Sequence, residues 1–183
     1  MTEFEKMRGG QLYNYNDPEV YASLKHANQL CERLNRMNGS EPEYRALLEE
    51  LIPGLPKSVT ITPPLHADHG HGIRLGENAF VNYNATFLDS AYITIGDYTL
   101  IGPNCSFFTP QHPFHFAERR NPVETGRPIT IGHDCWLGGN VTVLPGVTIG
   151  DYTIIGAGSV VTHDIPSGVI AAGNPCRVIR ENK

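Results

Sequence analysis

The chain has 183 residues, of which 18% are charged, and a formal net charge of −5. This acidic balance argues against a general nucleic-acid or membrane-surface binder. No stretch approaches the roughly 18 apolar residues that a membrane-spanning helix needs. The N-terminus MTEFEKMRGG lacks the apolar core of a secretion signal, so we expect a cytoplasmic protein. Its four cysteines form no C-x-x-C motif and are expected to be buried small apolar residues.

Residues 1–57 contain most of the helix-forming residues and predict a small helical region. Asp17 followed by Pro18 is typical of a helix start, with an N-cap residue before a first-turn proline. Apolar residues recur at spacings of three and four between Tyr21 and Met37. A second short helix is expected from Glu41 to Leu51. Together they form a helical hairpin that is too small to fold alone.

From about residue 58 a six-residue period replaces the helical one. Each hexad begins with an apolar residue, and seven of the twelve have glycine at the second position. The fifth position is small or β-branched almost throughout. The twelve hexads begin at Leu75, Val81, Phe87, Ile95, Ile101, Phe107, Ile131, Leu137, Val143, Ile149, Ile155 and Val161.

This period predicts a mainly β coil over residues 58–183. A short strand that turns after every six residues makes a three-sided coil of about 18 residues, with the leading apolar residue facing the axis. We expect the glycine to permit the backbone angles of a sharp corner. A β-sandwich with glycine-rich turns is the alternative, but sandwich strands keep no strict period of six. The period does not determine the hand of the coil.

The repeat resembles the hexapeptide-repeat acyltransferases. The tracts 128–139, 143–151, 156–162 and 172–180, together with the N-terminal block 7–19, resemble the galactoside and maltose O-acetyltransferases. The resemblance implies a left-handed parallel β-helix with a small N-terminal helical region. It also implies acetyl-CoA as the donor, a sugar such as maltose, glucose or a galactoside as the acceptor, and no metal. A homotrimer with active sites between subunits is expected.

The catalytic base is expected in an excursion between the hexads at Phe107 and Ile131. Acetyl transfer to an alcohol needs a base, and histidine titrates near neutral pH. The resemblance assigns this role to His112, which precedes Pro113. The nearby His115 is a weaker candidate for the base and is expected instead to contribute to loop packing. Glu124 is expected either to hold the His112 tautomer or to be a solvated loop glutamate.

The resemblance also implies an acceptor site rich in carboxylates and amides. Its expected residues are Asp17, Asp68, Asn82 and Asp89. Asp17 can equally be only a helix cap. Ser90 stands where galactoside-type members carry a second acid.

Donor binding is expected in the groove between neighbouring coils and near the C-terminus. Arg177 and Arg180 suit adenine stacking and phosphate pairing, although a solvated basic tail is the alternative. The full set of expected cofactor-binding residues is Trp136, Gly139, Ala157, Thr162, His163, Arg177 and Arg180.

Three other functions remain open at this point. The cluster His66, His69 and His71 could indicate a zinc enzyme like the γ-class carbonic anhydrases. A scaffold without catalysis is the second alternative. The third is transfer to another hydroxyl acceptor, namely serine, an antibiotic or a nucleotide sugar.

Overall fold

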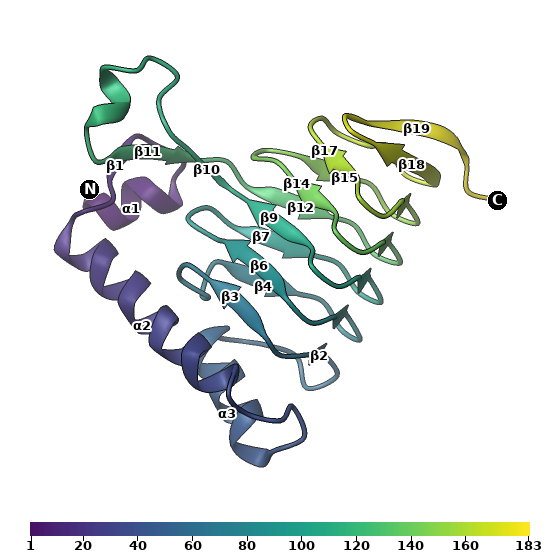
Figure 1. Ribbon diagram of the computed structural model, residues 1–183, viewed down its shortest axis with the longest axis horizontal. Helices are drawn as coiled ribbons and strands as arrows, with labels where there is room; N and C mark the ends of the chain where they lie inside the picture. The colour runs from purple at the N-terminus through teal and green to yellow at the C-terminus, as the bar shows by residue number, and fades with distance from the viewer.

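The computed structural model describes residues 1–183 and consists of a helical region beside a parallel β-helix (Figure 1). The helices are α1 (Glu3–Arg8), α2 (Pro18–Leu34) and α3 (Pro42–Leu51). The Asp17 side chain caps α2 by accepting from the backbone N–H groups of Glu19 and Val20. None of the helices combines the length and apolar character that a bilayer crossing requires.

Helix α1 was not predicted from the sequence, although its start carries a signal. Thr2 and Glu5 form a capping box, in which each side chain accepts from the backbone N–H of the other residue. This short helix carries Arg8 to the corner of the coil. It therefore positions a residue of the site described below.

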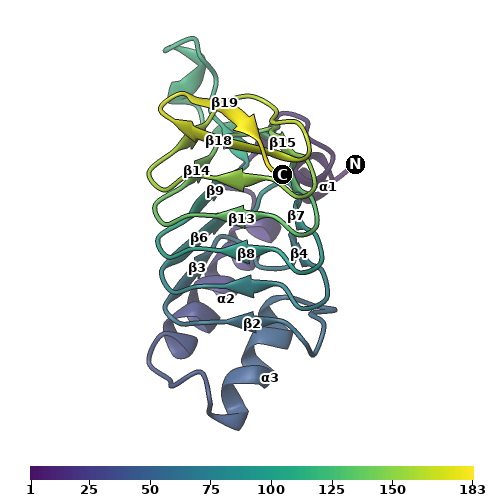
Figure 2. The same ribbon diagram turned by 90° about the vertical axis from the view of Figure 1, so that its right-hand side faces the viewer.

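The coil has three faces, each a sheet built mainly of parallel strands (Figure 2). The four-stranded sheet contains β4 (Ile73–Leu75), β7 (Ile93–Ile95), β12 (Ile129–Ile131) and β15 (Thr148–Ile149). The five-stranded sheet contains β3 (Leu65–Ala67), β6 (Ala85–Leu88), β9 (Ser106–Phe108), β14 (Thr142–Val143) and β17 (Val160–Val161). The seven-stranded sheet contains β2 (Thr60–Ile61), β5 (Phe80–Val81), β8 (Leu100–Ile101), β13 (Trp136–Leu137), β16 (Ile154–Ile155), β18 (Val169–Gly173) and β19 (Cys176–Glu181). The last pair, β18–β19, is antiparallel.

The leading residues of the hexads stack in three buried columns, one behind each face. In the five-stranded sheet, Phe87, Phe107, Val143 and Val161 are in register, and the first two rings stack at a centroid distance of 5.0 Å. All four residues are fully buried. The predicted mainly β coil is therefore confirmed, and so is the burial of all four cysteines. The boundary at residue 57 stays a prediction.

The structure corrects the role assigned to the glycines of the second hexad position. None of them has a positive φ; the left-handed residues are instead at the fourth position, for example Asn78, Asn104 and Tyr152. A Cβ atom at Gly102 would lie 2.7 Å from the backbone of the next coil, at Gly138. These glycines therefore permit close stacking of consecutive coils, whereas the corner angles are adopted by the asparagine, aspartate, tyrosine or glycine two residues later.

The excursion between β9 and β12 forms a separate small sheet with the N-terminus. It contains β10 (Pro110–Gln111), the 3-10 helix η1 (Glu118–Arg120) and β11 (Val123–Gly126). Strand β11 pairs antiparallel with β10 and with β1 (Tyr13–Asn14). The N-terminal segment thus fastens the base of the excursion.

Three crossings from the five-stranded to the four-stranded sheet lie at one corner of successive coils. They are residues 68–72, the turn 89–92 and the excursion 109–128. Because the coils are stacked in register, residues some 20 positions apart in the sequence become neighbours at this corner. The candidate site forms there.

Candidate active site

A cavity of about 410 Å³ opens at this corner, between the coil, helix α2 and the base of the excursion. Aromatic rings form one part of its wall, and carboxyl, hydroxyl and imidazole groups form another. It is lined by Tyr13, Tyr15, Asn16, Val20, Tyr21, Leu24, Asp68, His69, Ser90, His112 and Glu124. The arrangement suits a small polar ligand with both apolar and hydroxylated surfaces.

His112 and Glu124 are brought together on the excursion. The His112 Nε2 atom lies 3.6 Å from Glu124 Oε2, and the imidazole side chain is 53% exposed whereas the carboxylate is 13% exposed. Tyr15 packs edge-on against the imidazole ring with centroids 5.9 Å apart. One ring nitrogen of His112 therefore faces a carboxylate, and the ring remains accessible from the cavity.

Tyr13 holds Glu124 from the N-terminal strand. These two residues are directly opposed in the β1–β11 pairing, and the Tyr13 hydroxyl donates to Glu124 Oε1. Burial of the phenol, followed by its hydrogen bond to Glu124, raises the pKa of Tyr13, so the hydroxyl stays a donor. Tyr13 was not predicted as a site residue, because no local sequence pattern reveals a contact across 111 positions.

Asp68 lines the same cavity, and its surroundings disfavour the negatively charged form of its carboxyl group. Burial, followed by the negative charges of Asp89 and Glu124, raises the pKa of Asp68 to about 7. Near neutral pH this carboxyl group exists in both forms, so it can donate or accept a hydrogen bond from a hydroxylated ligand.

Asp89 is placed differently from its expected role as an acceptor ligand. Its side chain has no exposed surface. The carboxylate accepts from the backbone N–H groups of His69, Gly70 and Gly72 at 2.8, 3.1 and 2.9 Å. Because these bonds occupy the buried carboxylate, Asp89 acts on the cavity through the loop that it holds and through its charge beside Asp68.

Asp17 and Asn82 lie outside the lining of this cavity. Asp17 is occupied as the cap of α2. Asn82 stands at the corner after β5, half-buried, with its Oδ1 accepting from the Tyr83 backbone N–H at 2.8 Å. Their expected roles in acceptor binding stay predictions.

The expected donor residues lie outside the cavity with His112, on the seven-stranded sheet and at the corners of the later coils. Gly139 and Ala157 are at stacked corners, joined by a hydrogen bond from the Gly158 N–H to the Gly139 carbonyl at 2.9 Å. His163 and Arg177 line a second cavity of about 320 Å³. The Thr162 hydroxyl lies 2.8 Å from His163 Nδ1, and Arg180 is exposed on β19.

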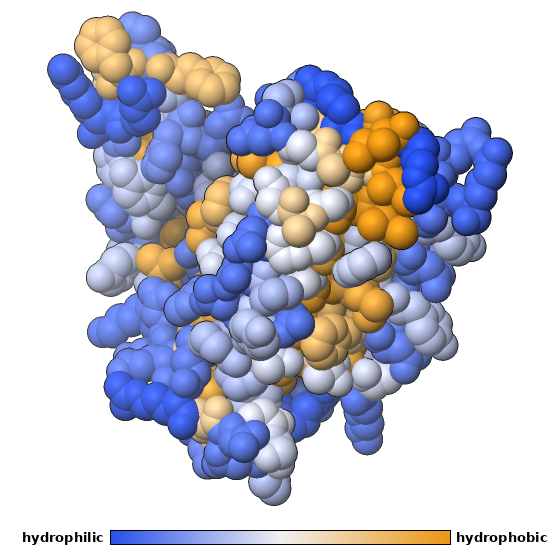
Figure 3. Space-filling model, turned by 45° about the vertical axis from the view of Figure 1, so that its right-hand side comes forward, coloured by the Kyte–Doolittle hydropathy of each residue, from blue (hydrophilic) through white to orange (hydrophobic).

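Trp136 lies on the outer face of the seven-stranded sheet and is 53% exposed. It is in register with Leu100 on one side and Ile154 on the other. Leu100, Val178 and Ile179 are also exposed, and Figure 3 shows hydrophobic side chains gathered on this side of the molecule. A contiguous apolar surface of this kind marks a place of association or ligand contact.

The two groups of predicted residues are therefore not joined within one chain. Figures 1 and 2 show the excursion on one side of the coil and the face formed by β8, β13 and β18 on the other. The cavity with His112 and the cavity with Arg177 share no lining residue.

The His66, His69 and His71 cluster does not form a metal site in this arrangement. His66 is exposed on β3, whereas His69 and His71 both contact the Ser23 hydroxyl. The Arg8 guanidinium lies 2.6 Å from His71 and opposes a second cation there. No group of three or more His, Cys, Asp or Glu side chains is placed to hold a metal ion.

Comparisons with known proteins agree with this architecture. Residues 6–55 match the maltose acetyltransferase hexapeptide capping motif, and residues 128–163 match the bacterial transferase hexapeptide of six repeats. The galactoside O-acetyltransferase of Escherichia coli K12 is 40% identical over 99% of this chain and 90% of its own length.

Solved structures of similar proteins cover the whole chain. A maltose O-acetyltransferase from Clostridium difficile 630 is 40% identical with a TM-score of 0.96, over 100% of this chain and 98% of that one. A hexapeptide-repeat acetyltransferase from Vibrio cholerae, complexed with acetyl coenzyme A, is 38% identical with a TM-score of 0.93 and full coverage of both. With the fold confirmed, the hand of the coil is left-handed, as the resemblance implied. The chain belongs to the maltose and galactoside O-acetyltransferase family of hexapeptide-repeat enzymes.

Proposed function

We propose that this enzyme transfers the acetyl group of acetyl-CoA to a hydroxyl group of a sugar, with His112 as the general base. Family membership makes the chain an acetyl-CoA-dependent O-acetyltransferase. The observation that carries the finer proposal is the His112 imidazole, which lies on the wall of the 410 Å³ cavity with Glu124 3.6 Å away.

The reaction needs one proton to move twice. The acceptor oxygen attacks the thioester carbonyl carbon while His112 takes the hydroxyl proton. The carbon–sulfur bond then breaks, and the imidazolium returns the proton to the departing thiolate. Glu124 is the positioning residue in this scheme, because a carboxylate opposite one ring nitrogen favours the protonated imidazole and leaves the other nitrogen to act as the base.

The cavity lining supports a sugar as the acceptor. Tyr15 and Tyr21 offer aromatic surface to the apolar face of a sugar ring, while Asp68 and Ser90 offer hydrogen-bonding groups to its hydroxyls. A maltose, glucose or galactoside acceptor fits this description. A smaller hydroxyl acceptor such as serine would leave much of the aromatic wall without a contact.

Donor binding and assembly are linked in this proposal. None of the residues expected to bind acetyl-CoA lines the cavity with His112, so we propose that a complete site needs the excursion of one subunit and the groove of another. The exposed apolar residues around Trp136 support association of subunits. We propose a homotrimer with three such sites. A cytoplasmic location, expected from the sequence, stays a prediction.

A panel of acceptors with acetyl-CoA tests the function. We expect release of free thiol with maltose, glucose and galactosides, and much slower release with serine or without an acceptor. The acetylated product is identified by mass spectrometry. Thiol release that is fastest with serine, or that occurs only as hydrolysis, would contradict a sugar acceptor.

The oligomeric state is tested by light scattering and by mixing inactive variants. We expect a solution mass about three times the 20.1 kDa of the chain. Co-expression of His112→Ala with Arg177→Glu should restore activity, because mixed trimers contain some sites with an intact base and an intact groove. A fully active species of 20.1 kDa would contradict sites between subunits.

A further inference from the structure

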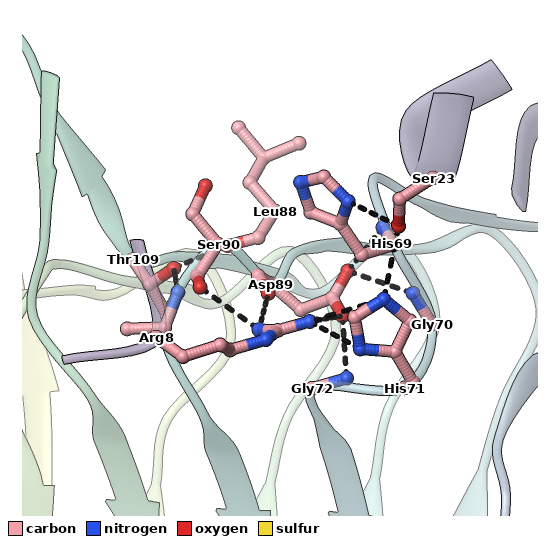
Figure 4. Close-up of polar contacts among 11 residues, drawn as sticks. Arg8, Ser23, His69, Gly70, His71, Gly72, Leu88, Asp89, Ser90 and Thr109 are labelled. Carbon is pink, nitrogen blue, oxygen red and sulfur yellow. Dashed lines mark hydrogen bonds and ion pairs between the residues drawn. The ribbon is translucent and has the colours of Figure 1, made fainter. Parts of the chain in front are cut away.

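Four polar side chains form a continuous chain of contacts that ends at the acceptor cavity (Figure 4). Arg8 Nη2 lies 2.6 Å from His71 Nδ1. His71 Nε2 lies 2.9 Å from the Ser23 hydroxyl, which in turn lies 2.9 Å from His69 Nδ1. Neither the catalytic scheme nor the expected acceptor site above uses these contacts.

The direction of every hydrogen bond in this chain follows from its first member. Arginine has only donors and stays protonated in proteins, so the nearer nitrogen of His71, Nδ1, must accept. Burial, followed by the charge of Arg8, lowers the pKa of His71, and the ring is therefore neutral. A neutral imidazole that accepts at Nδ1 carries its single proton at Nε2.

The remaining contacts transmit this polarity to His69. The His71 Nε2–H donates to the Ser23 oxygen, so the Ser23 hydroxyl is left to donate to His69 Nδ1. Burial lowers the pKa of His69 to about 4, although the Asp89 carboxylate opposes this change and Arg8 and His71 add to it. His69 is thus also neutral and also carries its proton at Nε2.

The His69 Nε2–H points to the cavity. This nitrogen has no hydrogen-bond partner in the protein, and no buried polar side-chain atom of the structure lacks one, so Nε2 is accessible. The cavity is the accessible space that His69 lines. His69 is 6% exposed, and its loop is held by the Asp89 carboxylate. A Cβ atom at Gly72 would lie 2.4 Å from Arg8 Nη1 and 2.6 Å from the Asp89 carbonyl oxygen, so the loop packs closely against both residues.

We infer that His69 is a specificity-determining residue, which presents a fixed Nε2–H donor to an oxygen of the acceptor. The inference rests on the proposed function in so far as the cavity holds the acceptor. The enzyme should therefore select acceptors that place a hydrogen-bond-accepting oxygen, either a hydroxyl or an ether oxygen, beside His69 Nε2. A deoxy or amino analogue at the same position loses the bond or brings a competing donor.

Two substitutions separate the donor from the rest of the ring. His69→Asn keeps an acceptor toward Ser23 but removes the donor that reaches the cavity, whereas His69→Gln keeps an amide N–H near the position of Nε2. We expect His69→Asn to raise the KM for the sugar about five- to thirtyfold, with the KM for acetyl-CoA unchanged. His69→Gln should remain within about threefold of the wild type. His66→Asn, on the exposed face of β3, is the matched control.

The acceptor series adds a readout that a merely structural role would not move. Where the contacted oxygen is a hydroxyl, wild type and His69→Asn should have the same KM for the deoxy sugar that lacks it. Equal KM values of wild type and His69→Asn for every sugar would overturn the inference.

The tautomer is tested without any acceptor. Two-bond ¹H–¹⁵N spectra of the ¹⁵N-histidine-labelled enzyme should show His69 protonated at Nε2, and Ser23→Ala should weaken this preference. The signal is assigned by its loss in His69→Gln. If the wild type acetylates no sugar, the proposed function fails. The spectrum still decides which nitrogen of His69 carries the proton, and so the direction of the hydrogen bonds from Arg8 to His69. A His69 ring protonated at Nδ1 in the wild type overturns the inference.

Discussion

His112→Ala is expected to lower kcat by about two to four orders of magnitude, because the acceptor hydroxyl then has no base to receive its proton. The KM for acetyl-CoA should change little, since none of the expected donor residues lines the cavity with His112. Initial rates of thiol release with a saturating sugar measure both quantities. Turnover close to that of the wild type would end the assignment of His112.

Two further substitutions separate the base from its surroundings. His115→Ala removes a histidine from the same excursion, where its ring packs 4.9 Å from Phe116, and should leave kcat within about fivefold. Glu124→Gln keeps an oxygen for the Tyr13 hydroxyl but removes the negative charge opposite His112. If Glu124→Gln lowers kcat and also shifts its pH profile, Glu124 is a positioning residue for His112.

Asp89→Ala is expected to destabilise the protein by about 3–5 kcal/mol, the range found when one partner of a buried charged network is removed. The substitution leaves three backbone N–H groups of the 69–72 loop without an acceptor. It also leaves the Arg8 guanidinium, 11% exposed and 3.9 Å from the Asp89 carboxylate, without its counter-charge. Urea unfolding at a fixed protein concentration measures the change in the free energy of unfolding.

Asp97→Ala is the matched control for this loss. Asp97 also accepts from a backbone N–H of the preceding coil, that of Glu77 at 2.8 Å, but it is exposed and water can replace it. Its removal should cost about 1 kcal/mol or less. If the two variants were equally stable, the buried network around Asp89 would have no special role in the corner.

The six-residue period was sufficient to predict the repeating part of this fold. The apolar residue that leads each hexad and the small residue at the fifth position predicted a three-sided coil, and these residues are buried in it. The interruption between Phe107 and Ile131 located the excursion with His112. A period of six is visible locally because every repeat makes the same contacts with the repeats before and after it.

The side chains that meet at the corner could not be predicted from the period, because they come together only when the coils stack. Asp68, Asp89 and Glu124 lie in three different crossings. The register between coils and the β1–β11 pairing bring them together, with Asp68 and Glu124 in the cavity wall and Asp89 buried behind it. The same applies to Arg8, Ser23 and His69, which come from a short helix, a long helix and a loop. The direction of these hydrogen bonds depends on contacts between residues that are distant in the sequence, so no sequence spacing could reveal it. For the same reason the glycines of the second position were assigned to corner angles, although the contact that requires them lies one full coil away.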